Sequence, residues 1–302
     1  MKNKIIVHFF LLCTLICILF VSPAKAQKEE DLALTLQNVA GNIYCLEGAG
    51  GNMGILKTDE GLLVVDSKVN EVADAVLKEL TSLSSNPLKI KYLIHTHYHS
   101  DHTGGDEVLS KYTETIIMHP NCKTSFIKDL KDKTAEKTFI PKIKTWSQGE
   151  SINLGGETVR LLNFGPNHTA GDLVVVFEKA KVIHTGDLFF NGMPAYIDVK
   201  DGSDTGNWVT TIETLCDKYP DYKFIPGHGP VCTAKDWLVF AEYLKYLRKE
   251  VTAAIMAGKT KQQAMDSIKI DQFKQIKANE LDNFMTIKTN IGWIFDEMTR
   301  DK

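Results

Sequence analysis

The first half of the chain alternates short apolar runs with glycine-rich turns, a pattern that predicts β-strands. The strand-like runs are LALTLQNV, NIYCLEG, MGILKTDEGLLVVDS and IKYLIHTH, which begin at residues 32, 42, 53 and 90. Residues 70–85 carry apolar side chains at helical spacing and predict the first helix. Two further helices are expected in GGDEVLSKY and NCKTSFIKDL, with the strand TIIMH between them.

The strand pattern returns after residue 150 in SINL, ETVRLLNF, DLVVVFE and KVIHTGD. A helix is expected over residues 207–219, followed by the strand YKFIPGHGP. Before this second run, Lys131 to Lys144 is lysine-rich and weakly patterned, which predicts a surface loop near the mouth of a site. From residue 234 the pattern is helical only, over 235–258 and 280–300 with a short helix between them.

Two similar runs of strands and helices predict an α+β fold in which two sheets face each other with helices outside, a four-layer αββα sandwich. The domain organisation that we expect is a signal peptide over 1–26, the αββα domain over 27–233, and a C-terminal helical extension over 234–302 that packs on the same domain.

The N-terminus has the pattern of a secretory signal peptide: Lys2 and Lys4 precede an apolar run, and Ala24-Lys25-Ala26 forms a small-x-small cleavage pattern. We expect cleavage after Ala26 and export to the periplasm. Because the apolar run is slightly long, an uncleaved membrane anchor is the alternative. Cleavage removes three lysines and leaves 32 basic against 38 acidic residues, a net charge of −6.

An acidic mature chain disfavours nucleic acid and anionic lipid as partners. We therefore expect a small-molecule substrate and no membrane association after cleavage, while the pattern leaves the oligomeric state open. The mature cysteines, Cys45, Cys122, Cys216 and Cys232, lie far apart without C-x-x-C spacing, so zinc-thiolate binding is not expected. They form either disulfides, of which an exported chain could make two, or buried free thiols.

Histidines are concentrated in the run HTHYHSDHTGG, His95 to Gly105, which holds four of the nine in the chain. In an extended segment His97 and His99 point the same way and can reach one point. Asp101 and His102 follow where the chain turns toward a helix and can reach a second point nearby. Without metal, the three imidazoles at this spacing would repel one another when protonated, so the run predicts metal binding.

Three later strand-like runs each end in a suitable ligand: His168 in FGPNHTAGD, Asp187 in VIHTGDLFF and His228 in FIPGHGP. Together with the first cluster they make seven ligands, too many for one tetrahedral zinc and suitable for two. Five imidazoles and two carboxylates favour two zinc ions per chain, with iron or manganese as alternatives.

These motifs, in this order from about Asn42 to Gly229, resemble the metallo-β-lactamase superfamily of binuclear metallohydrolases. The resemblance implies the αββα fold. It implies that one metal is held by His97, His99 and His168, the other by Asp101, His102 and His228, with Asp187 bridging them. The expected enzyme is a zinc-dependent hydrolase whose metal-bridging hydroxide attacks the carbonyl of an ester, thioester, lactone or lactam. Asp101 is the expected catalytic residue, orienting that hydroxide or taking its proton.

The residue type at the bridging position, Asp187, indicates which branches of the family the chain resembles. Asp187 resembles the glyoxalase II, lactonase and general hydrolase branches, whereas many β-lactamases of the fold have Cys or Ser there. Phe190 departs from the Lys of lactam-binding members and from the Tyr of lactonases, so at most a weak β-lactamase activity is expected. Lys245, Arg248 and Lys249 are similar to the basic tail of glyoxalase II, although a solvated helix face is the favoured explanation for them.

Further candidates follow the bridge or precede the ligands. Asn191 and Tyr196 lie in the loop after Asp187 and could donate to substrate as weak substrate-binding candidates, and Asn52 lies in an early hairpin. A last set has supporting roles: hydrogen bonding behind the ligands for His95 and His184, ligand orientation or strand capping for Asp66, and a structural role for His119.

Two alternatives to the hydrolase remain at this level. One is a mononuclear iron oxidoreductase on the same fold, similar to sulfur dioxygenases, and the other is a metal-binding accessory protein without turnover. Metal content separates the first from a binuclear zinc enzyme, because it predicts one iron instead of two zinc ions per chain.

Overall fold

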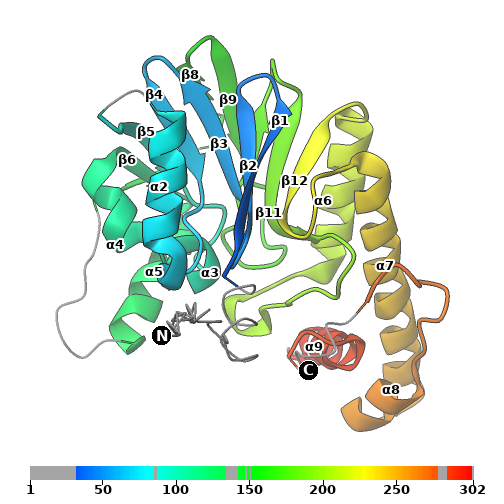
Figure 1. Ribbon diagram of the computed structural model, residues 1–302. Coiled ribbons are helices and arrows are strands. Elements are labelled where there is room, and N and C mark those ends of the chain that lie inside the picture. Colours follow the sequence, from blue (N-terminus) through cyan, green and yellow to red (C-terminus); the bar gives the residue numbers. More distant parts are fainter. Residues whose placement is uncertain are drawn as a thin grey trace, which may run out of the picture.

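Two sheets lie face to face with helices on both outer sides, as the computed structural model shows (Figure 1). The structure describes residues 32–84, 87–133, 142–146, 148–149, 151–277 and 284–300, so the expected signal peptide lies outside the described residues. The predicted αββα sandwich is confirmed. Within the described ranges, no helix combines the length and apolar content needed to cross a membrane.

The first sheet has seven strands in sequence order, antiparallel from β1 to β4 and parallel from β4 to β7. Its strands are β1 (Leu34–Ala40), β2 (Ile43–Gly48), β3 (Met53–Thr58), β4 (Gly61–Val65), β5 (Ile90–Ile94), β6 (Thr113–Met118) and β7 (Ile143–Thr145). Its outer face is covered by α2 (Ala73–Leu83), which η1 (Asn70–Val72) precedes, and by α5 (Pro120–Lys133).

The second sheet has six strands in the order β13-β12-β11-β10-β9-β8, with one parallel pair, β11 and β12. Its strands are β8 (Ser151–Leu154), β9 (Glu157–Leu162), β10 (Val174–Phe177), β11 (Val182–Phe190), β12 (Lys223–His228) and β13 (Cys232–Thr233). Its outer face is covered by α6 (Thr205–Lys218) and α7 (Ala234–Met256), while α8 (Lys261–Ser267) and α9 (Ile287–Thr299) follow beyond them.

Strand β4 shows why the apolar runs of the sequence are continuous. Side chains alternate across a strand, so a strand covered on both faces must be apolar at every position. Leu62 and Val64 pack in the cluster beneath α2, whereas Leu63 and Val65 pack between the two sheets. All five residues of β4 are buried.

Two elements differ from the sequence prediction. The expected helix over 104–112 is only α4 (Asp106–Leu109), and the chain tightens into η2 (Ser110–Tyr112) before it enters β6. The expected loop over Lys131 to Lys144 includes the end of α5 and the start of β7. Strand β7 buries one apolar residue, Ile143, at the edge of the sheet, and three residues are too few to leave a visible period of two. The four mature cysteines are free thiols.

The carbonyl of Leu188 in β11 ties both outer helices to the second sheet. The indole nitrogens of Trp208 in α6 and Trp237 in α7 each donate to this oxygen, at 2.9 Å. Both indoles are completely buried, and the ring of Trp237 stacks on Phe189. The helical tail is therefore held by a directional contact as well as by apolar burial.

Replacing Trp237 by Ala should lower the free energy of unfolding by about 3–5 kcal/mol, because it removes a buried ring and leaves a cavity. Urea unfolding of the chain from residue 27 onward measures the change. Leu238→Ala is the matched control. Leu238 is the next residue in α7 and is 39% exposed, so loss of its side chain should change the free energy of unfolding by less than about 0.5 kcal/mol. Equal losses in the two variants would contradict the anchoring role of Trp237.

Candidate metal centre

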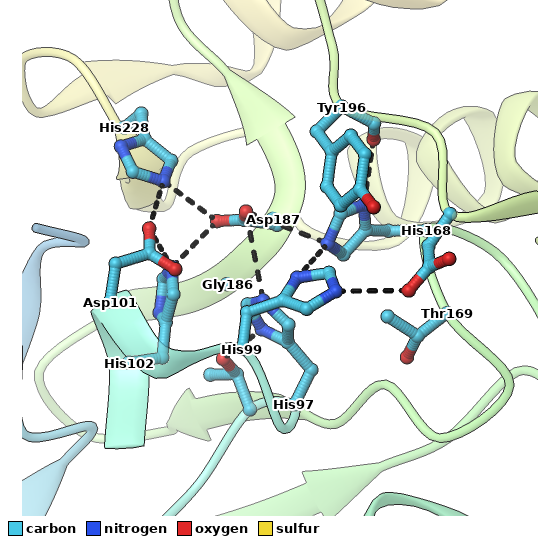
Figure 2. A network of polar contacts seen from close by, with 12 residues as sticks. His97, His99, Asp101, His102, His168, Thr169, Gly186, Asp187, Tyr196 and His228 are labelled. Carbon is cyan, nitrogen blue, oxygen red and sulfur yellow. Dashed lines mark hydrogen bonds and ion pairs between the residues drawn. The ribbon is translucent and has the colours of Figure 1, made fainter. Parts of the chain in front are cut away.

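The predicted ligands come together at one end of the sandwich, where several strands end in loops (Figure 2). His97 and His99 follow β5, and His99 precedes the short helix α3 (Ser100–Thr103), which carries Asp101 and His102. The remaining three ligands come from the second sheet: His168 from the loop between β9 and β10, Asp187 from within β11, and His228 from the last position of β12. The site therefore joins the two sheets.

Asp187 lies between two groups of side chains and turns one carboxylate oxygen toward each. Its Oδ2 is 3.7 Å from His97 Nε2 and 3.6 Å from His168 Nε2. Its Oδ1 is 3.0 Å from His102 Nε2 and 3.5 Å from His228 Nε2. Figure 2 shows this central position. The carboxylate thus offers one oxygen to each group.

The two groups of potential ligands are His97, His99, His168 and Asp187, and Asp101, His102, His228 and Asp187. Within each group the donor atoms lie within 4.8 Å of one another. The second group closes through Asp101, whose Oδ2 is 3.1 Å from His228 Nε2. Structural and catalytic zinc sites use three or four nitrogen and oxygen donors of this kind.

The hydrogen bonds of two imidazoles leave a place that a cation can fill between them. His99 Nε2 lies 3.0 Å from Asp198 Oδ2, and His168 Nδ1 lies 2.8 Å from the carbonyl oxygen of Tyr196, so both nitrogens donate. The other nitrogens, His99 Nδ1 and His168 Nε2, then carry lone pairs that face each other at 3.1 Å. A metal ion satisfies both, and the residues present thus fit a divalent cation.

Orphaned polar atoms give the same result. His97 Nε2, His102 Nε2 and Asp187 Oδ1 are buried, and none of them makes a well-directed hydrogen bond with the described residues, although His102 Nε2 and Asp187 Oδ1 face each other at 3.0 Å. Buried polar atoms without partners are rare in native proteins and call for an ion or a water. All three belong to the potential ligand groups.

The electrostatics of the centre favour positive charge. Burial opposes protonation of His102, but the carboxylates of Asp187, Asp101 and Asp66 outweigh it and raise the pKa of this imidazole well above its usual value. Burial and the charge of His102 lower the pKa of His97 well below its usual value. The cluster cannot protonate all its imidazoles together, and a metal supplies the charge that the carboxylates attract.

Two glycines allow the backbone to approach the ligands closely. A Cβ atom on Gly227 would lie 1.9 Å from Asp187 Oδ1, and one on Gly51 would lie 2.1 Å from the ring of His102. Both distances are far inside van der Waals contact, so only glycine fits at either position.

Oxygen atoms behind the ligands set the orientation of the rings. Asp66 Oδ2 accepts from His102 Nδ1 at 2.8 Å, and the two oxygens of Asp66 also accept from the backbone and hydroxyl of Thr96. Asp198 orients His99 and accepts from the hydroxyl of Tyr98 at 2.6 Å. The sequence indicated Asp66 as an orienting residue but gave no sign of Asp198, which lies eleven residues after the bridge.

The other candidate residues lie outside both ligand groups. His95 faces Asp106 at 3.0 Å, and His184 donates to the carbonyl oxygen of Asn52 at 3.0 Å, so both lie behind the centre. The side-chain amide of Asn52 donates to the carbonyls of Pro226 and Gly229 and holds the loop of His228.

Asn191 also braces this loop. Its amide donates to Pro230 O at 2.9 Å and its backbone to His228 O, and it does not line the cleft beside the ligands. These contacts give Asn191 a role in supporting the His228 loop, and its contact with substrate stays a prediction.

A cleft of about 430 Å³ opens beside the ligands. It is lined by Tyr98, His99, Ser100, Asp101, Asp129, Asp187, Phe190, Tyr196, His228, Phe284 and Met285. Lys245 and Arg248, the basic residues of the tail, are engaged by acidic side chains instead: Lys245 by Glu213 and Glu242, and Arg248 by Glu297.

Replacing Asp66 by Asn should weaken metal binding about 10- to 100-fold, because the charge that orients His102 is lost. Asp66 has a positive φ of 65°, a conformation that Asn adopts readily, so the backbone is preserved. Competition with a chromophoric zinc chelator measures the affinity. Asp74→Asn on the exposed face of α2 is the control. Equal metal affinities of the two variants would contradict the orienting role of Asp66 and leave it only the role of a cap at the end of β4.

Comparisons with known proteins agree with this geometry. Residues 46–228, more than half of the chain, match the model of the Metallo-beta-lactamase superfamily. The hydroxyacylglutathione hydrolase GloC of Haemophilus influenzae is 28% identical over 168 residues, which are 53% of this chain and 77% of that protein. An atrochrysone carboxyl ACP thioesterase of Claviceps purpurea is 23% identical over 225 residues, 74% of this chain and 64% of the thioesterase.

Solved structures show the same fold. A metallo-beta-lactamase from Pontibacter korlensis superposes with a TM-score of 0.59 at 19% identity and covers 70% of this chain and 99% of its own. A sec-alkylsulfatase from Pseudomonas sp. superposes with a TM-score of 0.69 at 14% identity, over 88% of this chain and 50% of its own. This chain thus spans less than two thirds of the thioesterase and half of the alkylsulfatase. From the matched family model and the shared fold, the chain belongs to the metallo-beta-lactamase superfamily.

Proposed function

We propose that this protein is an exported, binuclear zinc-dependent hydrolase that cleaves a carbonyl ester, thioester, lactone or lactam of a small molecule. The position of Asp187 carries the proposal, because one buried carboxylate offers a separate oxygen to each of two donor groups. A mononuclear site would need only one of those groups. Five imidazoles with two carboxylates suit zinc, and iron and manganese are the alternatives.

The metals and the chain have separate parts in the reaction. Two ions in these groups would lower the pKa of a shared water toward ~7 and polarise the substrate carbonyl. The chain holds Asp187 between the groups and excludes water from it, since this carboxylate is buried. The net reaction adds water across the acyl bond, and the proton of the water ends on the leaving group.

Both predicted ligand carboxylates line the cleft, and Asp101 is the more exposed of the two. Its side chain is 33% exposed, whereas that of Asp187 is 4% exposed. Asp101 can therefore accept a hydrogen bond from the attacking water, orient it, and take its proton. Tyr196 lies on the opposite wall with its ring 5.1 Å from that of His99. We assign its hydroxyl, which makes no hydrogen bond with the described residues, to donate to a substrate oxygen.

The names of two relatives support acyl hydrolysis, since one is a hydroxyacylglutathione hydrolase and the other an ACP thioesterase. Phe190 stacks on His228 at 5.3 Å and stands at the sequence position of the lysine in lactam-binding members of the family, so any β-lactamase activity should be weak. Export is supported by the N-terminal sequence pattern of residues 1–26.

Replacing Asp101 by Asn should lower kcat at least about 100-fold while most of the metal stays bound, because six ligands remain and the acceptor for the water is lost. The measurement combines elemental analysis of the purified mature chain with turnover of a chromogenic cephalosporin, a lactone, a thioester and a p-nitrophenyl ester. Asp217→Asn on the exposed face of α6 is the matched control.

The same tubes separate the alternatives. Two zinc ions per chain and one preferred substrate support the hydrolase. One iron without hydrolysis would establish the iron oxidoreductase in its place, and two zinc ions without turnover of any substrate would favour an accessory protein. Unchanged turnover in Asp101→Asn would refute the role given to this carboxylate.

A further inference from the structure

An apolar wall begins at the metal ligands. The ring of Phe190 lies parallel to the imidazole of His228, with 5.3 Å between centroids and an interplanar angle of 7°. The ring of Tyr196 lies 5.1 Å from His99 and 5.8 Å from His168. Substrate bound at the ligands must therefore lie against aromatic carbon on this side of the cleft.

The wall continues outward through the C-terminal part of the chain. Tyr196 contacts Phe284 at 5.1 Å and Trp293 at 5.3 Å, and these two rings lie 5.4 Å apart. Phe284 and Met285 line the cleft together with Tyr196. The aromatic surface thus runs unbroken from the ligands to the outside of the protein.

Phe284 is the outermost member of the wall and is 55% exposed. Among the described residues, the other large apolar side chains with comparable exposure are Tyr112, Leu238 and Met256, and none of them lines the cleft. The exposed part of an aromatic ring at the mouth of a cleft gains free energy when an apolar ligand covers it. The exposure of Phe284 is therefore useful to the site.

The charges of the cleft disfavour a remote anion. Its charged lining residues within the described chain are acidic, namely Asp101, Asp129 and Asp187, and they include no lysine or arginine. Lys128 and Lys200 line a neighbouring hollow of about 230 Å³ instead. Within the cleft itself, a carboxylate carried far from the donor groups would meet the apolar wall and, among the described lining residues, acidic side chains.

The outer wall lies outside the part of the chain that the family model matches. The family model matches residues 46–228, and Phe284, Met285 and Trp293 all lie beyond that range. Selection of substrate by the wall therefore does not follow from membership of the superfamily.

We propose that the cleft selects neutral substrates whose acyl group or ring is apolar, and discriminates against substrates with a distant anionic group. This inference rests on the proposed hydrolase, because it places the scissile carbonyl at the two ligand groups. Phe284 and Met285 are then specificity-determining residues.

Hydroxamates test the wall without turnover, because their head group chelates zinc. The zinc-loaded mature chain is titrated calorimetrically with acetohydroxamate, octanohydroxamate and the eight-carbon hydroxamate that ends in a carboxylate. Octanohydroxamate should bind at least about tenfold more tightly than acetohydroxamate, since burial of each methylene contributes up to about fourfold. The terminal carboxylate should remove most of that gain.

Variants assign the preference to the wall. Phe284→Ala should reduce the octano-to-aceto affinity ratio about three- to tenfold, whereas Met256→Ala, the loss of an 83% exposed side chain on α7, should leave the ratio unchanged. Phe284→Lys should raise the affinity for the carboxylate-ended hydroxamate above that for octanohydroxamate, a gain that a misfolded protein cannot show.

Hydrolysis of p-nitrophenyl hexanoate and of its partner with a terminal carboxylate, the adipate monoester, completes the test. If octanohydroxamate binding depends on Phe284 but no substrate is turned over, the proposed selectivity of the apolar wall stands and the proposed hydrolase function is refuted. Turnover with equal affinities for all three hydroxamates, or tighter binding of the carboxylate in the unaltered protein, refutes the wall and keeps the hydrolase. Absence of any hydroxamate binding would overturn both.

Discussion

The sharing of one buried carboxylate by two sets of imidazoles is the constraint on which this structure depends. Asp187 can serve both sets only if β11 places it between loops that come from opposite sheets. The strand meets this requirement with irregular pairing to β12 on both sides of Gly186. The facing sheets bring the remaining predicted ligands to the same point. The site therefore forms only when the two sheets pack against each other.

Such a cluster is costly for the polypeptide alone. Buried carboxylates and imidazoles lose hydration, and this loss is recovered only when charge and hydrogen bonds are both satisfied. Here Asp66 and Asp198 fix the outer nitrogens of His102 and His99, and the inner nitrogens are left for a cation. The two imidazole rings are therefore already held in the orientation that metal binding needs. This favours metal binding over a rearranged metal-free state.

The ligands could be predicted from sequence because each lies in a short motif with its own spacing beside Gly or Pro, and the sandwich could be predicted from two runs of alternating strands. Asp198 and Phe284 could not, because neither has a local pattern and each acts through a neighbour distant in sequence. The bracing contact of Asn191 could not be predicted for a related reason: adjacency to Asp187 does not reveal that its amide turns to Pro230. Strand β7 was missed because it has three residues.

The carbonyl of Leu188, which both indoles grip, lies one residue after the bridging carboxylate. The helical tail and the metal centre are consequently joined through a single peptide unit. If α7 loosened, β11 would shift and displace the carboxylate of Asp187. The helical tail therefore helps to hold Asp187 in position from a distance. Damage far from this end of the sandwich, even in residues that contact neither donor group, would first change how the two donor groups are spaced.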